Sequence, residues 1–277
     1  MKDIRVYVLN LDRHEDRLAH VSNALLGQSL DWQRFPAIDG SKVGDAALDE
    51  IIERTGPIPR MTRAARACTA SQIQIMRRFL ETEADYALIL EDDVELVEDF
   101  GERVREVLSA TDFDILNLNR QPTRSPKKRI FVRRKEILKV GDMVIHDLVG
   151  VHYGAAGYCV GRSAAQSIID LYGHPNMPID HILFNPNVSK LFGRIRIQQL
   201  FPALVRPRAG LVSSIQNEPV AEARMMRRKI QRAWTEVAIA PRLLLGTALG
   251  FYQVKVLEFG TAGVANSAEL YQNRKLP

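Results

Sequence analysis

An apolar run that ends abruptly in three acids constrains the fold of this chain more than any other feature. Residues 86–90 read Tyr-Ala-Leu-Ile-Leu, and Glu91-Asp92-Asp93 follows them directly. A short run without polar interruption is typical of a strand buried on both faces of a mostly parallel sheet. Ligands of open α/β sheets bind outside the carboxyl ends of the strands. The three acids therefore mark a candidate ligand-binding edge.

Strand and helix patterns alternate along the rest of the chain. Further strands are predicted at 4–9, 114–118, 157–160 and 195–198, with a short extended piece at 35–38. Helices are predicted over 16–26, 43–54, 64–81, 99–109 and 163–172, the last with Ser163 near its N-cap. This alternation predicts an α/β fold with a mostly parallel sheet flanked by helices.

The net charge of +5 belongs to one end of the chain. Residues 221–277 contain nine Lys or Arg and four Glu, whereas residues 1–220 contain 29 basic and 29 acidic residues. The basic character is therefore that of a tail and not of a nucleic-acid-binding body, so we expect no nucleic-acid partner. We expect a catalytic domain at 1–220 and a basic, partly apolar helical extension at 221–277.

Cysteine usage and the N-terminal residues indicate the compartment. Cys68 and Cys159 are the two cysteines, which excludes a disulfide scaffold and favours a reducing compartment. The first residues lead straight into a strand pattern without a secretory apolar segment, so a cytoplasmic location is expected.

The acidic triplet has two interpretations. Carboxylates at a strand end suit a hard divalent cation such as Mg²⁺ or Mn²⁺, which prefers oxygen ligands and can hold the phosphates of a nucleotide. The alternative is a solvated acidic turn that caps the next helix. The triplet alone leaves both open.

Several segments, taken in order, resemble glycosyltransferase family 25, which includes bacterial lipopolysaccharide galactosyltransferases and collagen galactosyltransferases. The segments that carry this resemblance are Val6-Tyr7-Val8-Leu9-Asn10-Leu11-Asp12-Arg13 with Arg17, Ala37-Ile38-Asp39-Gly40, Ala87 to Val94, Gly157-Tyr158-Cys159-Val160 with Ala164-Ala165, and Pro178-Ile179-Asp180. The resemblance covers roughly residues 2–215. It implies a GT-A type nucleotide-sugar-binding fold and an inverting, Mn²⁺- or Mg²⁺-dependent transfer from a UDP-sugar, often UDP-galactose, to a surface-glycan acceptor such as lipopolysaccharide.

The resemblance also implies roles for individual residues. Asp93 is the expected metal ligand, and Glu91 or Asp92 is expected to approach the sugar-nucleotide. Further residues expected to bind the donor are Asn10, Arg13, Arg17, Asp39 and Gly40. A surface charge is the alternative for each Arg, and plain turn chemistry is the alternative for Asp39-Gly40.

Asp180 is the candidate catalytic base by its position in the family pattern. Inversion in one displacement requires a group that accepts the proton of the acceptor hydroxyl. The alternative is that Asp180 caps a helix after the proline loop, and one residue can serve both roles. His152 is a weaker candidate as a metal ligand, and a structural or surface role is favoured for it.

One segment departs from the family pattern. Cys68 and Ser71 match it, but Ala65 stands where the family usually has Glu and Gln72 where it has His. If those positions contact the substrates, the departures imply a changed substrate or reduced activity. They also motivate a second hypothesis: a non-catalytic nucleotide-sugar-fold protein that binds a glycan or a partner enzyme.

Two basic regions complete the sequence picture. The segment 120–139 is either a solvated hairpin or a basic loop near an acidic acceptor. In the tail, the uncharged run between Arg242 and Lys255 is too short to span a bilayer. Basic residues beside Trp and Leu suit an interfacial helix on anionic lipid, so the protein would be peripheral at the inner membrane. The alternative is a helical pair packed on the domain or on a second subunit.

Overall fold

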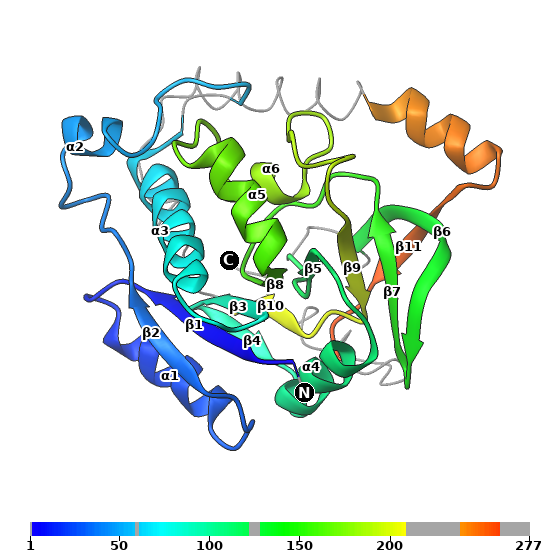
Figure 1. The fold of residues 1–277 in the computed structure, drawn as a ribbon, viewed down its shortest axis with the longest axis horizontal. Helices are drawn as coiled ribbons and strands as arrows, with labels where there is room; N and C mark the ends of the chain where they lie inside the picture. The colour runs from blue at the N-terminus through cyan, green and yellow to red at the C-terminus, as the bar shows by residue number, and fades with distance from the viewer. Residues whose placement is uncertain (1, 59–60, 122–127, 209–238, 261–277) are drawn as a thin grey trace, which may run out of the picture.

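The computed structural model describes residues 2–58, 61–121, 128–208 and 239–260, and every structural statement refers to these ranges (Figure 1). Its centre is a nine-stranded sheet with the strand order β11-β6-β7-β9-β5-β8-β3-β1-β2. The strands of this sheet are β1 (Ile4–Asn10), β2 (Trp32–Pro36), β3 (Tyr86–Glu91), β5 (Ile115–Asn117), β6 (Lys128–Val140), β7 (Met143–Leu148), β8 (Gly157–Gly161), β9 (Ile197–Phe201) and β11 (Tyr252–Leu257).

The sheet is mixed and not mostly parallel. β1 is parallel to β2 and β3, and β5 is parallel to β9. β8 runs antiparallel between β3 and β5, and the hairpin of β6 and β7 adds two more antiparallel pairs. The apolar run at 86–90 predicted burial correctly, but burial on both faces does not report the direction of the neighbouring strand. The α/β class of the fold is confirmed.

Helices cover both faces of the sheet (Figure 1). One face packs against α3 (Arg63–Leu80), α5 (Arg162–Tyr172) and α6 (Ile179–Phe184), and the other against α1 (Glu15–Leu25) and α4 (Phe100–Ala110). Alternate residues of β1 divide between the two layers, with Tyr7 on the α3 side and Val6 on the α1 side. The protein is therefore a three-layer sandwich of helices, sheet and helices.

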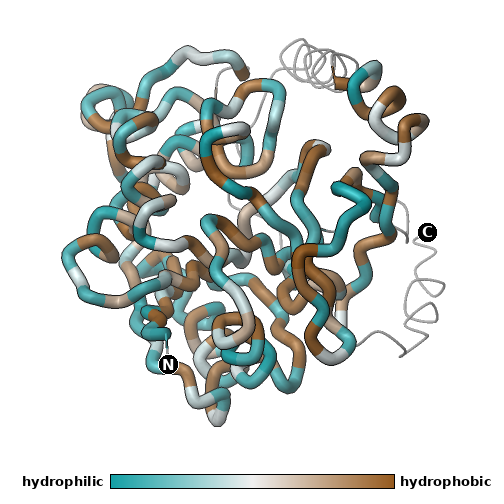
Figure 2. The backbone as a smooth tube through the Cα atoms, turned by 45° about the vertical axis from the view of Figure 1, so that its right-hand side comes forward, coloured by the Kyte–Doolittle hydropathy of each residue, from teal (hydrophilic) through white to brown (hydrophobic). Residues whose placement is uncertain are grey.

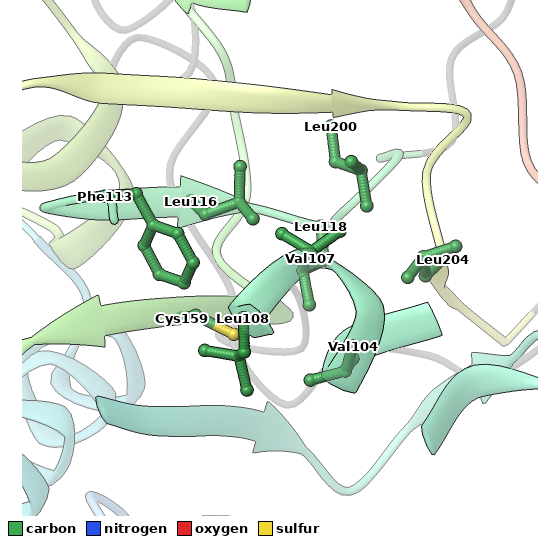
Figure 3. Close-up of a pocket in the computed structure, with 9 residues that line it drawn as sticks. All are labelled: Val104, Val107, Leu108, Phe113, Leu116, Leu118, Cys159, Leu200 and Leu204. Carbon is green, nitrogen blue, oxygen red and sulfur yellow. The ribbon is translucent and has the colours of Figure 1, made fainter. Parts of the chain in front are cut away.

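A small cavity lies in the core between α4 and the sheet (Figure 3). Apolar side chains such as Val107, Leu116 and Leu200 line it, together with Cys159. Burial raises the pKa of the Cys159 thiol, so this group stays protonated. A lining without charged or hydrogen-bonding groups does not suit a sugar or a nucleotide, so this cavity is a packing gap in the core.

Two local predictions are wrong. The helix expected at 43–54 is limited to α2 (Asp45–Asp49), because the Glu53 N–H donates to the carbonyl of Pro175 at 2.9 Å and the chain leaves the helical path. The N-cap of α5 is Gly161 and not Ser163, since strand β8 leads directly into the helix. Of the two interpretations of the segment 120–139, the hairpin agrees with the structure, because the long strand β6 pairs antiparallel with β7; residues 122–127 lie outside the described residues.

Part of the segment expected to be a helical tail belongs to the sheet. Residues 239–248 are helical, but β11 pairs antiparallel with β6 and forms one edge of the sheet. Alternation of apolar and polar residues in Tyr252–Leu257 explains why this stretch is a strand. The boundary expected at 220/221 lies outside the described residues, but the last described strand is part of the main sheet.

Candidate active site

Parallel pairing of β1 and β3 brings their polar ends together. The register places Leu9 opposite Glu91, so the next residues, Asn10 and Asp92, are neighbours at the same edge of the sheet. Apolar residues on both strands are buried up to this point, and the acids begin where the strand emerges from the core. The structure thus brings Asn10 and the acidic triplet, which the sequence analysis named separately, to one edge of the sheet.

A second small sheet fixes the acidic turn. Asp92 and Asp93 form the turn between β3 and β4 (Val94–Leu96), and β4 pairs antiparallel with β10 (Val205–Pro207). The Arg208 N–H donates to the Asp93 carbonyl oxygen at 2.6 Å. These backbone contacts fix the turn after β3, so the side chains of Asp92 and Asp93 stay at the end of that strand.

Asp92 is held by polar partners. Its Oδ2 accepts a hydrogen bond from Asn10 Nδ2 at 2.7 Å, and Arg17 Nη1 lies 3.5 Å from its Oδ1. Asn10 is itself oriented by Arg34, whose Nε donates to Asn10 Oδ1 at 2.9 Å. Burial raises the pKa of Asp92, and the contacts of Asn10 and Arg17 offset part of that rise. Asp92 is thus an anchored residue of the site.

The carboxylate of Asp93 has fewer polar partners than that of Asp92. Arg17 Nη1 lies 3.7 Å from Asp93 Oδ2, whereas the buried Oδ1 has no hydrogen-bond partner among the described residues. Burial and repulsion from Asp92 raise the pKa of Asp93. A buried carboxylate oxygen without a donor is costly, so Asp93 Oδ1 is suited to contact a cation or a hydrogen-bond donor.

Glu91 projects to the α3 side of the sheet. Gln72 Nε2 lies 3.4 Å from its Oε1, and the thiol of Cys68 lies 3.9 Å from the same oxygen. The Tyr158 hydroxyl donates to Gln72 Oε1 at 2.8 Å and so orients the amide. Burial, followed by repulsion from Asp93 and Asp92, raises the pKa of Glu91 to about 8. Glu91 therefore holds a proton at neutral pH unless a cation displaces it.

Asp180 approaches the acidic triplet from α6. Its Oδ2 accepts the Gly154 N–H and its Oδ1 accepts the His181 N–H, both at 3.0 Å. Its charge contributes to the raised pKa of Glu91, so the two side chains share one electrostatic environment. The helix-cap interpretation is wrong, because Pro178 is the N-cap of α6 and Asp180 lies in the first turn.

Arg13, Asp39 and Gly40 form a neighbouring cross-link. Arg13 Nη1 pairs with Asp39 Oδ2, and Asp39 Oδ1 accepts the Ser41 N–H at 2.9 Å. A Cβ at Gly40 would come within 2.7 Å of the Arg63 carbonyl oxygen, so a glycine is required where the turn touches the start of α3. Arg13 and Asp39 pair with each other, whereas among the described residues it is Arg17 that reaches the acidic turn.

The donor set fits a divalent cation that arrives with a phosphate ligand. Within the described ranges, no group of three His, Cys, Asp or Glu side chains is arranged to hold a metal ion by itself. Mg²⁺ commonly binds through one or two carboxylates and completes its shell with water and substrate phosphates. Asp93 Oδ1, which has no hydrogen-bond partner among the described residues, and Glu91, once it has lost its proton, would supply such a partial shell.

Sequence reasoning missed Lys128 and Asn119 as residues of this region and named His152 only as a weaker candidate. Burial lowers the pKa of Lys128 to about 8, and the charge of Asp180 partly offsets this. Asn119 and His152 are buried at 0% and 1% exposure, and neither side chain has a hydrogen-bond partner of normal geometry in the described structure. The sequence could have identified Asn119 as a candidate site residue, since it directly follows the strand predicted at 114–118. Lys128 was hidden among the charges of the basic segment 120–139.

The departures from the family pattern fall in two different places. Gln72 contacts Glu91 and so belongs to the site. Ala65 lies in the first turn of α3, where its N–H donates to Thr62 Oγ1 at 3.1 Å. Ser71, which matches the family pattern, connects α3 with the segment after β2, because its Oγ accepts the Ile38 N–H at 2.9 Å.

Comparisons with known proteins find the following similarities. A family profile described as "Glycosyltransferase family 25 (LPS biosynthesis protein)" matches residues 3–183. The chain is 24% identical over 173 residues to the lacto-N-neotetraose biosynthesis glycosyltransferase LgtE of Neisseria gonorrhoeae, covering 60% of each chain. It is 23% identical over 189 residues to procollagen galactosyltransferase 2 of Mus musculus, covering 64% of this chain and 29% of that one. A crystal structure of a glycosyltransferase involved in glycosylation of the major capsid of PBCV-1 aligns with 10% identity and a TM-score of 0.42, covering 83% of this chain and 99% of that one.

Proposed function

Because the chain belongs to glycosyltransferase family 25, we propose that it transfers a sugar from a UDP-sugar donor to a glycan acceptor. Galactose is the sugar we assign, and a surface glycan such as lipopolysaccharide is the acceptor. The family description names LPS biosynthesis and one matched relative is named a galactosyltransferase, which supports both assignments. We further propose that the transfer inverts the configuration at the sugar carbon.

The observation that carries this proposal is the under-compensated acidic turn. Glu91, Asp92 and Asp93 are three adjacent carboxylates, and Arg17 is the cation that contacts the two aspartates. Burial raises the pKa values of all three acids, and repulsion from neighbouring acids adds to the rise for Glu91 and Asp93. A site of this kind gains stability when a cation enters it, which suits a diphosphate donor that carries a metal ion.

We assign Mn²⁺ or Mg²⁺ as the cofactor, with Asp93 as its main ligand and Glu91 beside it. When bound, the ion would neutralise the negative charge that grows on the departing UDP. Asp92 keeps the turn in place through its hydrogen bond with Asn10. Arg17 balances part of the charge of both aspartates before the donor binds.

The donor nucleotide is assigned to the side of the site formed by β1 and β2. Asn10 and Arg17 lie at the end of β1 and the start of α1, next to the acidic turn. Arg13, Asp39 and Gly40 form the adjoining rim, where the Arg13–Asp39 pair holds the loops after β1 and β2 together. In this proposal the sugar of the donor points toward β3 and Asp180.

Asp180 is the proposed base that accepts the proton of the acceptor hydroxyl. The Gly154 and His181 N–H groups hold its two carboxylate oxygens, which fixes the direction in which the remaining lone pairs point. Asp180 is partly exposed, so an acceptor can reach it from solvent. Lys128 lies near enough to Asp180 for the charge of that carboxylate to act on the Lys128 pKa.

A second candidate function is non-catalytic binding of a nucleotide-sugar, a glycan or a partner enzyme. The observation that favours it is Gln72, which differs from the family pattern and contacts Glu91 directly. An amide cannot exchange a proton with Glu91 as a histidine can. In this case the site would bind its ligand without turning it over.

Release of UDP from UDP-galactose, measured with and without Mn²⁺, tests the proposal. We expect metal-dependent release by the unmodified chain and its loss in Asp93→Asn. Thermal stabilisation by UDP with Mn²⁺ but no release from a panel of UDP-sugars would favour the binding function. The absence of both stabilisation and release would contradict sugar transfer and nucleotide-sugar binding alike.

A further inference from the structure

Exposed large apolar side chains concentrate in one short segment. Among the described residues, seven large hydrophobic side chains are exposed, and six of them lie between 244 and 256. These six are Leu244, Leu245, Leu249, Phe251, Val254 and Val256, with exposures of 67%, 62%, 61%, 64%, 45% and 37%. The seventh, Leu26, lies on its own at the end of α1. Single exposed apolar residues are normal on a protein surface, but a continuous group of them marks an interaction surface.

The helix at 239–248 is apolar on both of its faces. Ile239 and Leu243 point inward and pack with Val149, and Gly246 lies directly against the ring of Tyr252. The outward side carries the adjacent residues Leu244 and Leu245, and Leu249 follows Leu245 by four residues in the turn after the helix. A helix at a water boundary normally carries polar residues on its outer face. Since the inner face is already packed, the outer face is available for another apolar surface.

The edge strand extends the same surface. Residues of a strand alternate between faces, so Val254 and Val256 lie on the side of Tyr252, the side on which the helix packs. In the antiparallel pairing with β6, Val256 lies opposite Arg129 and Tyr252 lies opposite Arg133. Directly paired residues share a face of the sheet, so both arginines flank the exposed valines. Figure 2 shows the helix and the strand with their brown, hydrophobic stretches at one margin of the molecule.

Basic charge surrounds this apolar group. The exposed residues of β6 include Arg129, Arg133, Arg134 and Lys135, against a single acid, Glu136. Arg242 is the one charged residue of the helix 239–248, and it is exposed. Residues 221–277 together carry the whole net charge of +5. Within the described ranges, no helix has the length and hydropathy required to cross a bilayer.

We propose that this helix–strand surface, defined by Leu244, Leu245, Leu249, Phe251, Val254 and Val256 with Arg129 and Arg133, docks on a membrane that contains anionic lipid. Apolar side chains enter the boundary between headgroups and acyl chains, while nearby arginines contact the lipid phosphates. The charge of the surface favours anionic lipid over a neutral membrane. This inference does not depend on the sugar-transfer proposal, because the surface contains none of the residues assigned to that reaction.

Vesicle flotation with the full chain tests the proposal. We expect binding to vesicles rich in phosphatidylglycerol and weak binding to pure phosphatidylcholine vesicles. The double variant Leu245→Ser/Leu249→Ser should lower the partition coefficient by about tenfold or more, because it removes apolar area that would be buried. Arg129→Glu/Arg133→Glu should lower binding to anionic vesicles by at least about tenfold and leave weak binding to neutral vesicles unchanged.

Leu26→Ser is the matched control, since it replaces an equally exposed leucine outside the surface. It should bind vesicles as the unmodified chain does, and circular dichroism should show that all variants are folded. Equal vesicle binding by all variants, or no binding by the unmodified chain, would overturn the proposal. A dimer that Leu245→Ser/Leu249→Ser converts to a monomer, without any vesicle binding, would assign the surface to a second copy of this chain instead.

Discussion

Asn10 and Asp92 come from strand ends 82 residues apart in sequence and are joined by a 2.7 Å hydrogen bond. The parallel register of β1 and β3 creates this contact, since Leu9 pairs with Glu91. Asn10 also donates to the His14 carbonyl at 2.9 Å and accepts from Arg34. One buried amide therefore connects the acidic turn with β2 and with the start of α1.

Replacement of Asn10 by alanine should destabilise the protein. The change removes the donor to a buried carboxylate and leaves Arg34 without its acceptor, so we expect a loss of about 1–3 kcal/mol in the free energy of unfolding. Urea denaturation measures this loss. Asn23→Ala on the exposed side of α1 is the control and should change stability by less than about 0.5 kcal/mol. Equal effects of the two variants would contradict the anchoring role of Asn10.

Stability should depend on pH through Glu91. Its pKa is raised to about 8 in the folded protein, from 4.5, so the folded state holds this proton more tightly than the unfolded state does. The resulting stability is fully present below pH 4.5 and is lost as the pH rises through 8. Glu91→Gln cannot ionise and should be the more stable protein above pH 8, by on the order of 1–3 kcal/mol.

Thermal unfolding of metal-free protein, compared between wild type and Glu91→Gln at several pH values, checks this prediction. Plotted against pH, the melting temperatures of wild type and Glu91→Gln should converge at acidic pH and separate at alkaline pH. Glu83→Gln, at an exposed position just before β3, should follow the wild-type curve throughout. A constant difference between wild type and Glu91→Gln would show that burial of the charge is not the cause.

Asp93→Asn should separate activity from stability. The variant removes a buried negative charge whose Oδ1 has no partner, so the melting temperature should stay the same or rise. UDP release should fall by at least about 100-fold, because an amide is a poor ligand for a hard cation. Asp31→Asn, at an exposed position, should retain activity. A fall in activity that parallels a fall in melting temperature would instead indicate a structural role for Asp93.

Gly154 should be required for the orientation of Asp180. It has a positive φ of 84°, its N–H donates to Asp180 Oδ2, and a Cβ there would come within 2.4 Å of Gln121 Oε1. Gly193 has a φ of 86° but open space around it, so Gly193→Ala experiences the backbone strain without the crowding. Both alanine variants should lose about 1 kcal/mol of stability. Only Gly154→Ala should also lower kcat, by about tenfold; unchanged kcat would argue against Asp180 as the base.

Much of the fold was predictable from local pattern. The apolar run at 86–90, the alternation at 4–9 and the helix at 64–81 all correspond to observed elements within one or two residues. The family resemblance stated from the sequence motifs is confirmed by the match over residues 3–183. The meeting of Asn10, Arg17 and the acidic turn was predictable because the ends of parallel strands share an edge.

Other features depend on contacts that local sequence does not report. The antiparallel direction of β8 is set by its two neighbours, and the burial of Lys128 is set by the start of a strand that carries six other charges. The extent of α2 is decided by a hydrogen bond to Pro175, which lies more than 100 residues away. The burial of His152 could not be predicted either, because its place in the sequence does not distinguish it from a surface residue.

The position of β11 at the outer side of β6 governs how the chain can be shortened. A protein cut at residue 220 would lose this strand and present the backbone amides and carbonyls of Lys128–Arg133 as an open edge. Open edges of this kind recruit strands from other molecules, so the shortened chain would tend to aggregate. The final segment thus protects the sheet against intermolecular pairing, and deletions made to isolate the catalytic part should retain it.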